Sequence, residues 1–347
     1  MSDNPLAADL EHVLEHIRPI SEELRGARIF ITGGTGFFGC WLLESFAWAN
    51  DRLGLGAEAL VLTRNFEAFQ KKVPHLAGRT DIRFQIGDVR DFRFPPGRFS
   101  HVIHAATAAD VKMNAEHPVE MLDIMLTGTR QALDFSVQSG AKQFLFTSSG
   151  AIYGPQPPEI TRLAEDYTGG PNVSDPQSAK GEGKRLSELL CALYARQHGL
   201  AVKVARCFAY VGPYLPLHEQ FAAGNFIRDA KAGGPIHVSG DGTTFRSYLY
   251  AADLAIWLWT ILVRGASNHP YNVGSHNELT IAQLAKKVSE AFPGKPPVAI
   301  AKKPMPGQPA ARYIPDTSRA EKELGLREWI GLEDAIRRTS QWQEKRS

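Results

Sequence analysis

The sequence predicts an α/β protein built on a doubly wound parallel β-sheet (Rossmann-type), and three observations support this fold class. The first is a glycine-rich turn at residues 29–39 that joins a short apolar strand to an apolar helix. The second is a repeated alternation of apolar strands and helices that continues to about residue 205. The third is a change beyond Arg206, where prolines and glycines separate short segments and predict a smaller C-terminal substrate lobe.

The glycine-rich turn has the features of a phosphate-binding site. Its glycines are Gly33, Gly36 and Gly39. In such a turn the first glycine permits the tight bend, the second lets a pyrophosphate approach the backbone, and the third lets helix pack on strand. The following helix begins with Phe37 and Phe38, and its free amides and dipole favour an anion. The segment predicts a dinucleotide cofactor; the alternative is an ordinary strand–helix turn.

The segment before this turn, residues 1–25, predicts an N-terminal helical extension. Its apolar residues recur at helical spacing, with an interruption at Pro19. His12 and His16 lie four residues apart, which would suit a metal pair. Because no third ligand is visible, a solvated helix face is the preferred interpretation, and we expect no metal.

The next two strands end in residues that can contact the adenosine half of a dinucleotide. The strand at 59–62 is followed by Arg64, where an acidic residue would hold ribose hydroxyls. Arg64 could instead hold a 2′-phosphate, which favours NADP over NAD, or stack on adenine, or lie free on the surface. After the strand at 82–86 come Asp88 and Val89. Asp88 could accept a hydrogen bond from the adenine amino group or serve as a turn residue.

Strands four and five complete the expected cofactor edge. Strand four, at 101–104, is followed by Ala105 and Ala106, whose small side chains let the backbone lie close to a cofactor or simply pack tightly. Strand five, at 143–147, delivers Ser148 and Ser149 at its carboxyl end, where open α/β sheets bind ligands.

The pattern also predicts the domain boundaries. We expect a dinucleotide-binding domain over residues 26–208 together with about 236–265, and a nucleotide-sugar-binding lobe over 209–235 and 266–347. The last return to the main sheet is expected around 248–264, as a strand that leads into an apolar helix.

Composition excludes several classes of protein. The 39 basic and 37 acidic residues leave no charge excess for nucleic acid or an anionic membrane. The three cysteines are scattered in apolar surroundings, as reduced buried thiols are. No apolar run reaches the ~18 residues of a membrane span. The first residues do not form a signal peptide, so the cytoplasm is the expected compartment.

Further motifs follow one another in the order of a known family. They are residues 32–39, 87–88, 102–106, 148–154, 184–185, 206–208, 240–246, 271–274 and 316–325. With these motifs the chain resembles the extended short-chain dehydrogenase/reductases, the NAD(P)-dependent nucleotide-sugar epimerase/dehydratase group, over about residues 27–330.

The resemblance implies roles for several residues. Ser149 would hydrogen-bond a sugar hydroxyl, and Lys184 would hold the nicotinamide ribose and bias the neighbouring acid–base group. Four residues of the lobe match nucleotide contacts, two of them arginines suited to clamp a diphosphate. The alternative for each is a surface or structural role. They are Asn225, Asn272, Arg246 and Arg312.

The chain departs from the family pattern at catalytic positions. The family tyrosine, four residues before Lys184, is replaced by Lys180. Met125 and Ala209 stand where asparagines are usual. Gly150-Ala151 replaces the Asp-Glu pair of sugar 4,6-dehydratases, which disfavours that reaction because an elimination uses paired carboxylates.

The resemblance makes a nucleotide-sugar epimerase that works through a transient 4-keto sugar the leading hypothesis. A 4-keto reductase or an unusual dehydratase is the alternative within the same site, and a catalytically silent dinucleotide-binding sensor is the rival from another class. Lys180 has two interpretations. It disables the chemistry, or it serves as a base whose pKa is lowered by Lys184 one helical turn away.

Two long helices predict the assembly. The helices at 118–139 and 178–198 have more apolar residues than one face of a sheet can cover, the first being apolar nearly all round. Pairing them with their copies would give a homodimer, as is common in the family.

Overall fold

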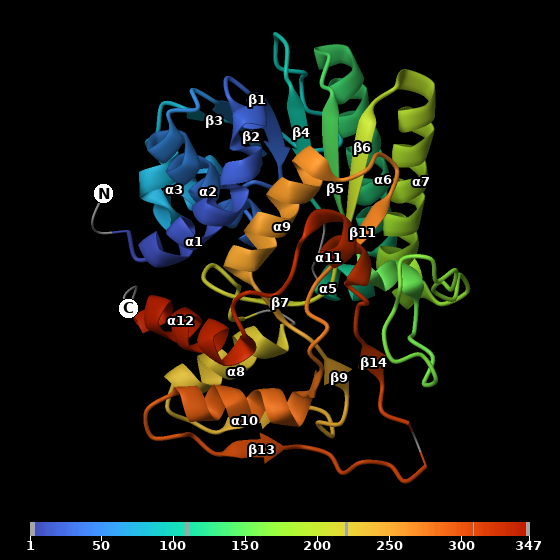
Figure 1. Ribbon diagram of the computed structural model, residues 1–347. Coiled ribbons are helices and arrows are strands. Elements are labelled where there is room, and N and C mark those ends of the chain that lie inside the picture. The colour runs from blue at the N-terminus through green and yellow to red at the C-terminus, as the bar shows by residue number, and fades with distance from the viewer. Residues whose placement is uncertain (1–3, 108–110, 219–220, 308, 345–347) are drawn as a thin grey trace.

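In the residues that the computed structural model describes (4–107, 111–218, 221–307 and 309–344), seven parallel strands form the main sheet, in the order β11-β6-β5-β4-β1-β2-β3 (Figure 1). The chain winds outward from β1 in both directions, which confirms the doubly wound fold. The topology reverses between β1 and β4, and folds of this type bind their ligands at such a point. The strands are β1 (Arg28–Thr32), β2 (Glu58–Thr63), β3 (Ile82–Ile86), β4 (His101–His104), β5 (Gln143–Ser149), β6 (Ala201–Cys207) and β11 (Pro270–Val273).

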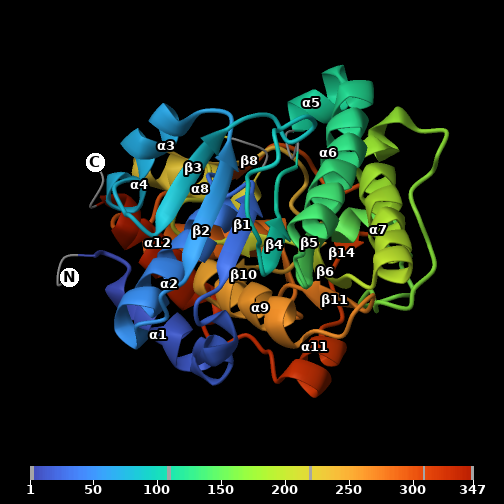
Figure 2. The same cartoon turned by 90° about the horizontal axis from the view of Figure 1, so that it is seen from above.

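Helices cover both faces of this sheet (Figure 2). Helices α6 and α7 lie on one face, and α2 and α9 on the other. Every residue of α9 from Ala251 to Val263 is buried, because the helix lies between the sheet and α1. The helices of this domain are α2 (Phe37–Leu53), α3 (Phe66–Lys72), α4 (Pro74–Ala77), α5 (Val111–Glu116), α6 (Pro118–Ser139), α7 (Ala179–His198) and α9 (Ala251–Arg264), with short 3-10 turns η2 (Gly150–Tyr153) and η3 (Pro176–Ser178).

The last strand of the main sheet differs from the sequence prediction. The helix expected within 248–264 is present as α9, but the strand before it, β10 (Leu249–Tyr250), pairs with β7 (Tyr210–Val211) outside the main sheet. The main sheet is completed by β11, which pairs with β6. The apolar run before α9 was therefore assigned to the wrong sheet, because a strand's partner is not encoded in its own residues.

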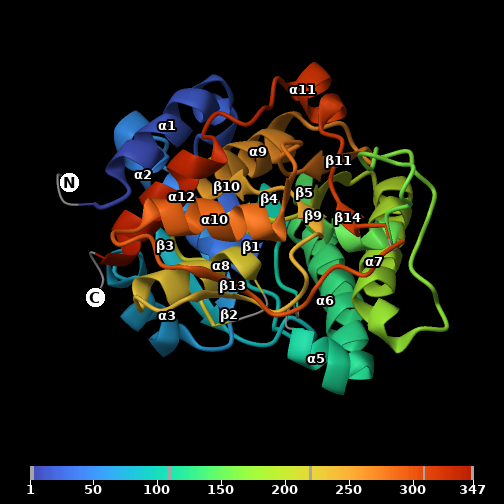
Figure 3. The same ribbon diagram turned by 90° about the horizontal axis from the view of Figure 1, so that it is seen from below.

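The second lobe lies beyond the carboxyl ends of the strands (Figure 3). Its helices α8 and α10 pack together, and β8, which was expected in the first domain, pairs with β13 instead. Thr280 and Gln283 form a capping box that stabilises the start of α10. The elements are α8 (Ala222–Lys231), β8 (Ile236–Val238), β9 (Phe245–Arg246), β12 (Leu279–Thr280), α10 (Ile281–Ala291), β13 (Val298–Ile300), β14 (Arg312–Tyr313), α11 (Ser318–Leu324) and α12 (Leu332–Glu344).

The N-terminal extension is helical, as predicted, with α1 (Ala7–Ile17) followed by η1 (Arg18–Leu24). Its histidine face is not solvated, however. His12 lies 3.1 Å from the carboxylate of Asp253, which is fully buried and also accepts hydrogen bonds from two backbone amides before α12. The described residues hold no cluster of metal-ligating side chains. The extension therefore joins α9 to the C-terminal segment.

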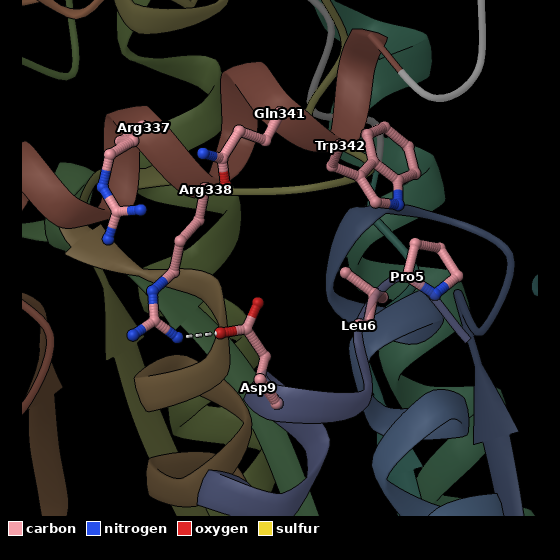
Figure 4. Close-up of a pocket in the computed structure, with 8 residues that line it drawn as sticks. Pro5, Leu6, Asp9, Arg337, Arg338, Gln341 and Trp342 are labelled. Carbon is pink, nitrogen blue, oxygen red and sulfur yellow. Dashed lines mark hydrogen bonds and ion pairs between the residues drawn. The ribbon is translucent and has the colours of Figure 1, made fainter. Parts of the chain in front are cut away.

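The N-terminal helix α1 and the C-terminal helix α12 also contact each other directly. Arg338 of α12 is ion-paired with Asp9 of α1 beside a cavity of about 260 Å³ (Figure 4). Residues 1–3, at the start of the expected extension, and 345–347, at the end of the expected lobe, lie outside the described residues. None of the described helices has the length and hydropathy that a membrane span requires.

Candidate active site

The glycine-rich turn is built so that only one of its three glycines faces open space. Gly33 has a φ of +73°, and a Cβ there would lie 2.4 Å from the carbonyl carbon of Ala105. A Cβ on Gly39 would lie 2.2 Å from the carbonyl carbon of Gly34. Gly36, at the N-cap of α2, is exposed, and its Cβ would meet only the Gly33 oxygen at 3.4 Å. The open position coincides with the helix N-terminus, where a phosphate is favoured.

The residues expected around the adenosine lie at the ends of β2 and β3. Arg64 is exposed. The Asp88 carboxylate accepts hydrogen bonds from the backbone and the guanidinium of Arg90, and the guanidinium lowers the pKa of Asp88. This geometry fits the turn role of Asp88. Val89 is buried against Gly128 of α6.

The residues that flank the turn are packed from both sides. Phe38 lies edge-on to Tyr210, with 5.1 Å between ring centroids, and Phe37 packs beside it. Ala105 and Ala106 are half-buried, and the Ala106 amide donates to the Thr32 hydroxyl. The backbone of Ala105 and Ala106 lies so close to Gly33 that residue 33 must lack a Cβ, which shows tight packing at this edge.

A buried histidine that the sequence analysis did not single out links β1, β4 and α6 through hydrogen bonds. His104 lies 2.8 Å from the Thr32 hydroxyl and 3.2 Å from the Thr129 hydroxyl, and Thr129 donates to Ser187 of α7. Burial lowers the pKa of His104 to about 3, with a further contribution from Lys184, so the imidazole is neutral. The signal in the sequence was a polar residue inside an apolar strand.

Hydroxyl groups without partners lie at the same edge of the sheet. The side-chain oxygens of Ser148, at the end of β5, and Thr107, just after β4, are buried and have no hydrogen-bond partner among the described residues. Unpaired buried polar groups are costly, so a polar ligand at this edge would satisfy them. Together with the open position at Gly36, they fit a dinucleotide that runs along the carboxyl ends of the strands.

Lys180 and Lys184 lie on the first turns of α7. Lys184 is buried, and its ammonium donates to the Thr147 carbonyl at 2.8 Å and lies over the ring of Phe146. Burial lowers the pKa of Lys184 to about 8, and the charge of Lys180 contributes to the same direction. Burial also lowers the pKa of Lys180. The expected cause is therefore not found at Lys180, whose pKa is lowered by burial; repulsion between the two lysines contributes only at Lys184, and there it is secondary to burial.

The two arginines of the lobe point in different directions. In the register of β9 and β14, Arg246 pairs with Tyr313 and Phe245 pairs with Arg312, so Arg246 and Arg312 project to opposite faces of the small sheet. Arg246 is half-buried, and burial lowers its pKa. Arg312 is ion-paired with Glu278. A joint clamp of the two guanidinium groups is not formed in this structure.

The two asparagines also differ. Asn225 lies on the first turn of α8, half-buried, where its side-chain oxygen accepts from Arg228. Asn272 is fully buried in β11, and the expected nucleotide contact is wrong for it. Its amide accepts from the Tyr153 hydroxyl and donates to two backbone carbonyls. With its donors and acceptor used inside the protein, Asn272 holds β11 to the loop after η2.

Ser149 is where the two parts of the site meet. Its hydroxyl accepts from the Ala151 amide. The Tyr313 hydroxyl of β14 lies beside the next residue, 2.6 Å from a Cβ built on Gly150, and the Tyr313 ring lies under the Arg246 guanidinium. The Ser149 hydroxyl is near enough to lower the pKa of Tyr313. Tyr313 was missed by the sequence analysis, because nothing in its own segment points to β5.

The fold and the site define a nucleotide-dependent enzyme with a doubly wound domain and a ligand lobe. A family model, the NAD dependent epimerase/dehydratase family, matches residues 29–274. The chain belongs to this family, whose members are extended short-chain dehydrogenase/reductases that act on nucleotide sugars.

Curated relatives cover most of the chain. UDP-glucuronic acid decarboxylase 6 of Arabidopsis thaliana is 30% identical over 310 residues, which are 89% of this chain and 86% of that protein. UDP-glucuronic acid decarboxylase 1 of Danio rerio is 28% identical over 327 residues, 94% of this chain and 74% of that protein.

Solved structures share the fold. A UDP-glucose 4-epimerase from Thermotoga maritima, solved with UDP-glucose, has a TM-score of 0.76 at 23% identity and covers 92% of this chain and 99% of its own. A dTDP-glucose 4,6-dehydratase from Streptomyces venezuelae, solved with NAD bound, has a TM-score of 0.76 at 24% identity, covering 92% and 97%.

The glycine geometry yields a matched pair of substitutions. Gly39→Ala should lower the melting temperature of the protein without cofactor, because the new methyl group overlaps the backbone of Gly34. Gly36→Ala should leave that temperature within about 1 °C but weaken dinucleotide binding by about 10-fold or more, because its methyl group occupies the open phosphate position. Differential scanning calorimetry with and without NAD or NADP measures both effects. Equal cofactor affinity in Gly36→Ala and the unsubstituted protein would contradict the phosphate site.

Proposed function

We propose that this protein binds NAD or NADP together with a nucleoside-diphosphate sugar and epimerises the sugar through a transient 4-keto form. The observation that supports this most directly is the meeting of Ser149, at the carboxyl edge of the main sheet, with Tyr313 and Arg246 of the lobe. A hydroxyl group and a guanidinium group thus face the place where a sugar and its diphosphate would lie. The nicotinamide would supply hydride acceptance and return.

The residues of the chain have separate tasks in this proposal. The open backbone at Gly36 and the first amides of α2 bind the cofactor phosphates. Lys184 orients the nicotinamide ribose from the buried side, and Ser149 holds the sugar hydroxyl that loses or gains a proton. Arg246 neutralises the substrate diphosphate, and Asn225 is a further nucleotide contact. Arg312, on the opposite face of the small sheet and ion-paired with Glu278, is not assigned to the diphosphate in this proposal.

A second candidate is the decarboxylation of a nucleotide-linked uronic acid, favoured by the names of the curated relatives. A ketone at C4 makes the C6 carboxylate a β-keto acid. The C5–C6 bond then breaks, carbon dioxide leaves, and C5 takes a proton. This reaction uses the same transient ketone, so the same site would serve it.

The cofactor preference follows from Arg64. The end of β2 has no carboxylate that would repel a 2′-phosphate, and the Arg64 side chain is exposed at that edge. A guanidinium there suits a phosphate, so NADP is the preferred cofactor in this proposal.

We further infer that the protein is a homodimer through α6 and α7. These helices lie side by side on one face of the sheet (Figure 2). Several apolar residues on them are exposed. On α7 the exposed residues recur at i, i+3 and i+7, which is one stripe of a helix. They are Leu186, Leu189 and Leu193 on α7, and Val119 and Val137 on α6.

The first test is a thermal scan. A ligand at about 100 times its Kd stabilises a protein by about 2.7 kcal/mol, so binding is visible as a higher melting temperature. We expect a rise with NADP, a smaller one with NAD, and an additional rise with UDP-glucose or UDP-glucuronic acid. A response to the cofactor and to no nucleotide sugar would identify a dinucleotide sensor and overturn the proposed function.

The second test concerns Lys180. An ammonium at the tyrosine position cannot exchange a proton as the phenol does, so Lys180→Tyr should raise turnover of the nucleotide sugar by about 10²-fold or more. Lys180→Met is the matched control, because it removes the charge without adding a hydroxyl. If both substitutions abolish an existing activity, the lysine amine is the base and the disabling interpretation is wrong.

The third test concerns assembly. Light scattering at micromolar concentration should give twice the 38.2 kDa mass of the chain. Leu189→Glu should give the single-chain mass, because a charge is placed in the apolar stripe. Ile300→Glu, at an equally exposed position in β13, should leave the mass unchanged. A mass of one chain for the unsubstituted protein would refute the dimer.

A further inference from the structure

Tyr313 is held at the end of β5 by the backbone on both sides of it. Strand β14 pairs with β9, and the Ile314 amide donates to the side-chain oxygen of Gln156 at 2.9 Å. The Leu163 amide donates to the Ile314 carbonyl at 2.8 Å. The phenol ring packs on Phe208, with 4.6 Å between ring centroids. The position of the phenol therefore does not depend on its own side-chain hydrogen bond.

The Tyr313 hydroxyl needs the glycine at position 150. A Cβ on Gly150 would lie 2.6 Å from the Tyr313 oxygen, so any other residue there would displace the hydroxyl or be displaced. The chain thus combines a missing tyrosine before Lys184 with a missing side chain after Ser149. Without the tyrosine, the site needs a proton-exchanging group from another segment. Without a side chain at position 150, there is space for that group.

Opposing influences act on the protonation of Tyr313. Burial raises the pKa of Tyr313, whereas the neighbouring Ser149 hydroxyl and the positive charge of Arg246 act in the opposite direction and favour the anion. The other titratable groups that face it are Cys207 of β6 and Tyr153 of η2. The Arg246 guanidinium carbon lies 5.4 Å from the centre of the phenol ring. A phenolate formed during turnover would therefore have a fixed cation beside it.

We propose that Tyr313, acting through Ser149, exchanges the proton of the reacting sugar hydroxyl in place of the absent family tyrosine; this inference rests on the proposed function. Epimerisation begins with oxidation, in which the nicotinamide would take the hydride from the sugar carbon. The sugar hydroxyl gives its proton to Ser149, and Ser149 gives its own proton to a Tyr313 phenolate beside Arg246. In the reduction that follows, the carbon takes the hydride back, the carbonyl oxygen takes the Ser149 proton and Ser149 takes the Tyr313 proton, so one complete epimerisation restores the phenolate.

A role for Tyr313 is compatible with the higher turnover expected for Lys180→Tyr. The relay through Ser149 is longer than a direct contact between a phenol and the sugar. A tyrosine at position 180 would therefore shorten the transfer and make Tyr313 dispensable. This dependence separates a proton-transfer role from a structural one.

The first experiment measures binding, without turnover. Isothermal titration compares UDP-glucose, UDP-4-deoxyglucose and UDP on the unsubstituted protein, Tyr313→Phe and the control Tyr271→Phe, whose hydroxyl bonds Glu323 away from Ser149. The unsubstituted protein and the control should favour UDP-glucose over its deoxy analogue by about 3- to 10-fold, the worth of one hydrogen bond. Tyr313→Phe should lose this preference and keep its affinity for UDP, because Arg246 is unchanged.

The second experiment measures turnover in two backgrounds. Tyr313→Phe should lower turnover by about 10²-fold in the unsubstituted protein and by less than about 5-fold in Lys180→Tyr. An equal loss in both backgrounds, or an unchanged hydroxyl preference in the titration, would overturn the role of Tyr313 while the proposed function stands. Absence of binding of UDP and of both sugars to the unsubstituted protein would overturn the two together.

Discussion

The close approach of two backbone segments at Gly33 and Ala105 is the constraint on which the site depends. Strands β1 and β4 are neighbours in the sheet, and their chains leave it in opposite directions. A Cβ at position 33 would lie 2.4 Å from the carbonyl carbon of Ala105, so the turn after β1 can pass this close to β4 only because residue 33 is a glycine. That contact fixes the start of α2, and the helix N-terminus then faces the crevice between the diverging chains. The buried imidazole of His104 on β4 also hydrogen-bonds with Thr32 on β1 and with Thr129 on α6, and so links the same two strands to that helix.

What the sequence could predict follows from the range of the interactions involved. The glycine turn, the strand ends and the exposed stripe of α7 are local patterns, and the structure places them as expected. The seventh strand, the interior position of Asn272 and the opposite directions of Arg246 and Arg312 depend on partners far along the chain. Asn272 shows the difference well. A polar residue in a motif suggested a ligand, but its partners are Tyr153 and carbonyls from two distant loops.

Burial shifts the pKa values of the groups in the site more than their interactions with neighbouring charges do. It is the main cause of the lowered pKa of both lysines and of the raised pKa of Tyr313. These shifts move the groups towards their neutral forms, in which a lysine can accept and a phenol can donate a proton. With a pKa of about 8, Lys184 nevertheless remains mostly protonated near neutral pH, so burial biases these groups towards their neutral forms without removing the charge of the site.

The departures from the family pattern are best understood through the lobe. In a site built only from the first domain, Lys180 and Gly150 would remove a proton donor and a side chain from the same edge. The second lobe brings a phenol to that edge on β14, fastened by Gln156 and Leu163 and not by the helix that bears the lysines. Proton transfer would then depend on the position of the lobe against β5 as much as on α7. Since Arg246 and Tyr313 are register partners in one small sheet, the group that holds the diphosphate and the group that exchanges the proton would keep a fixed arrangement. Binding of the nucleotide would thereby position the chemistry on the sugar.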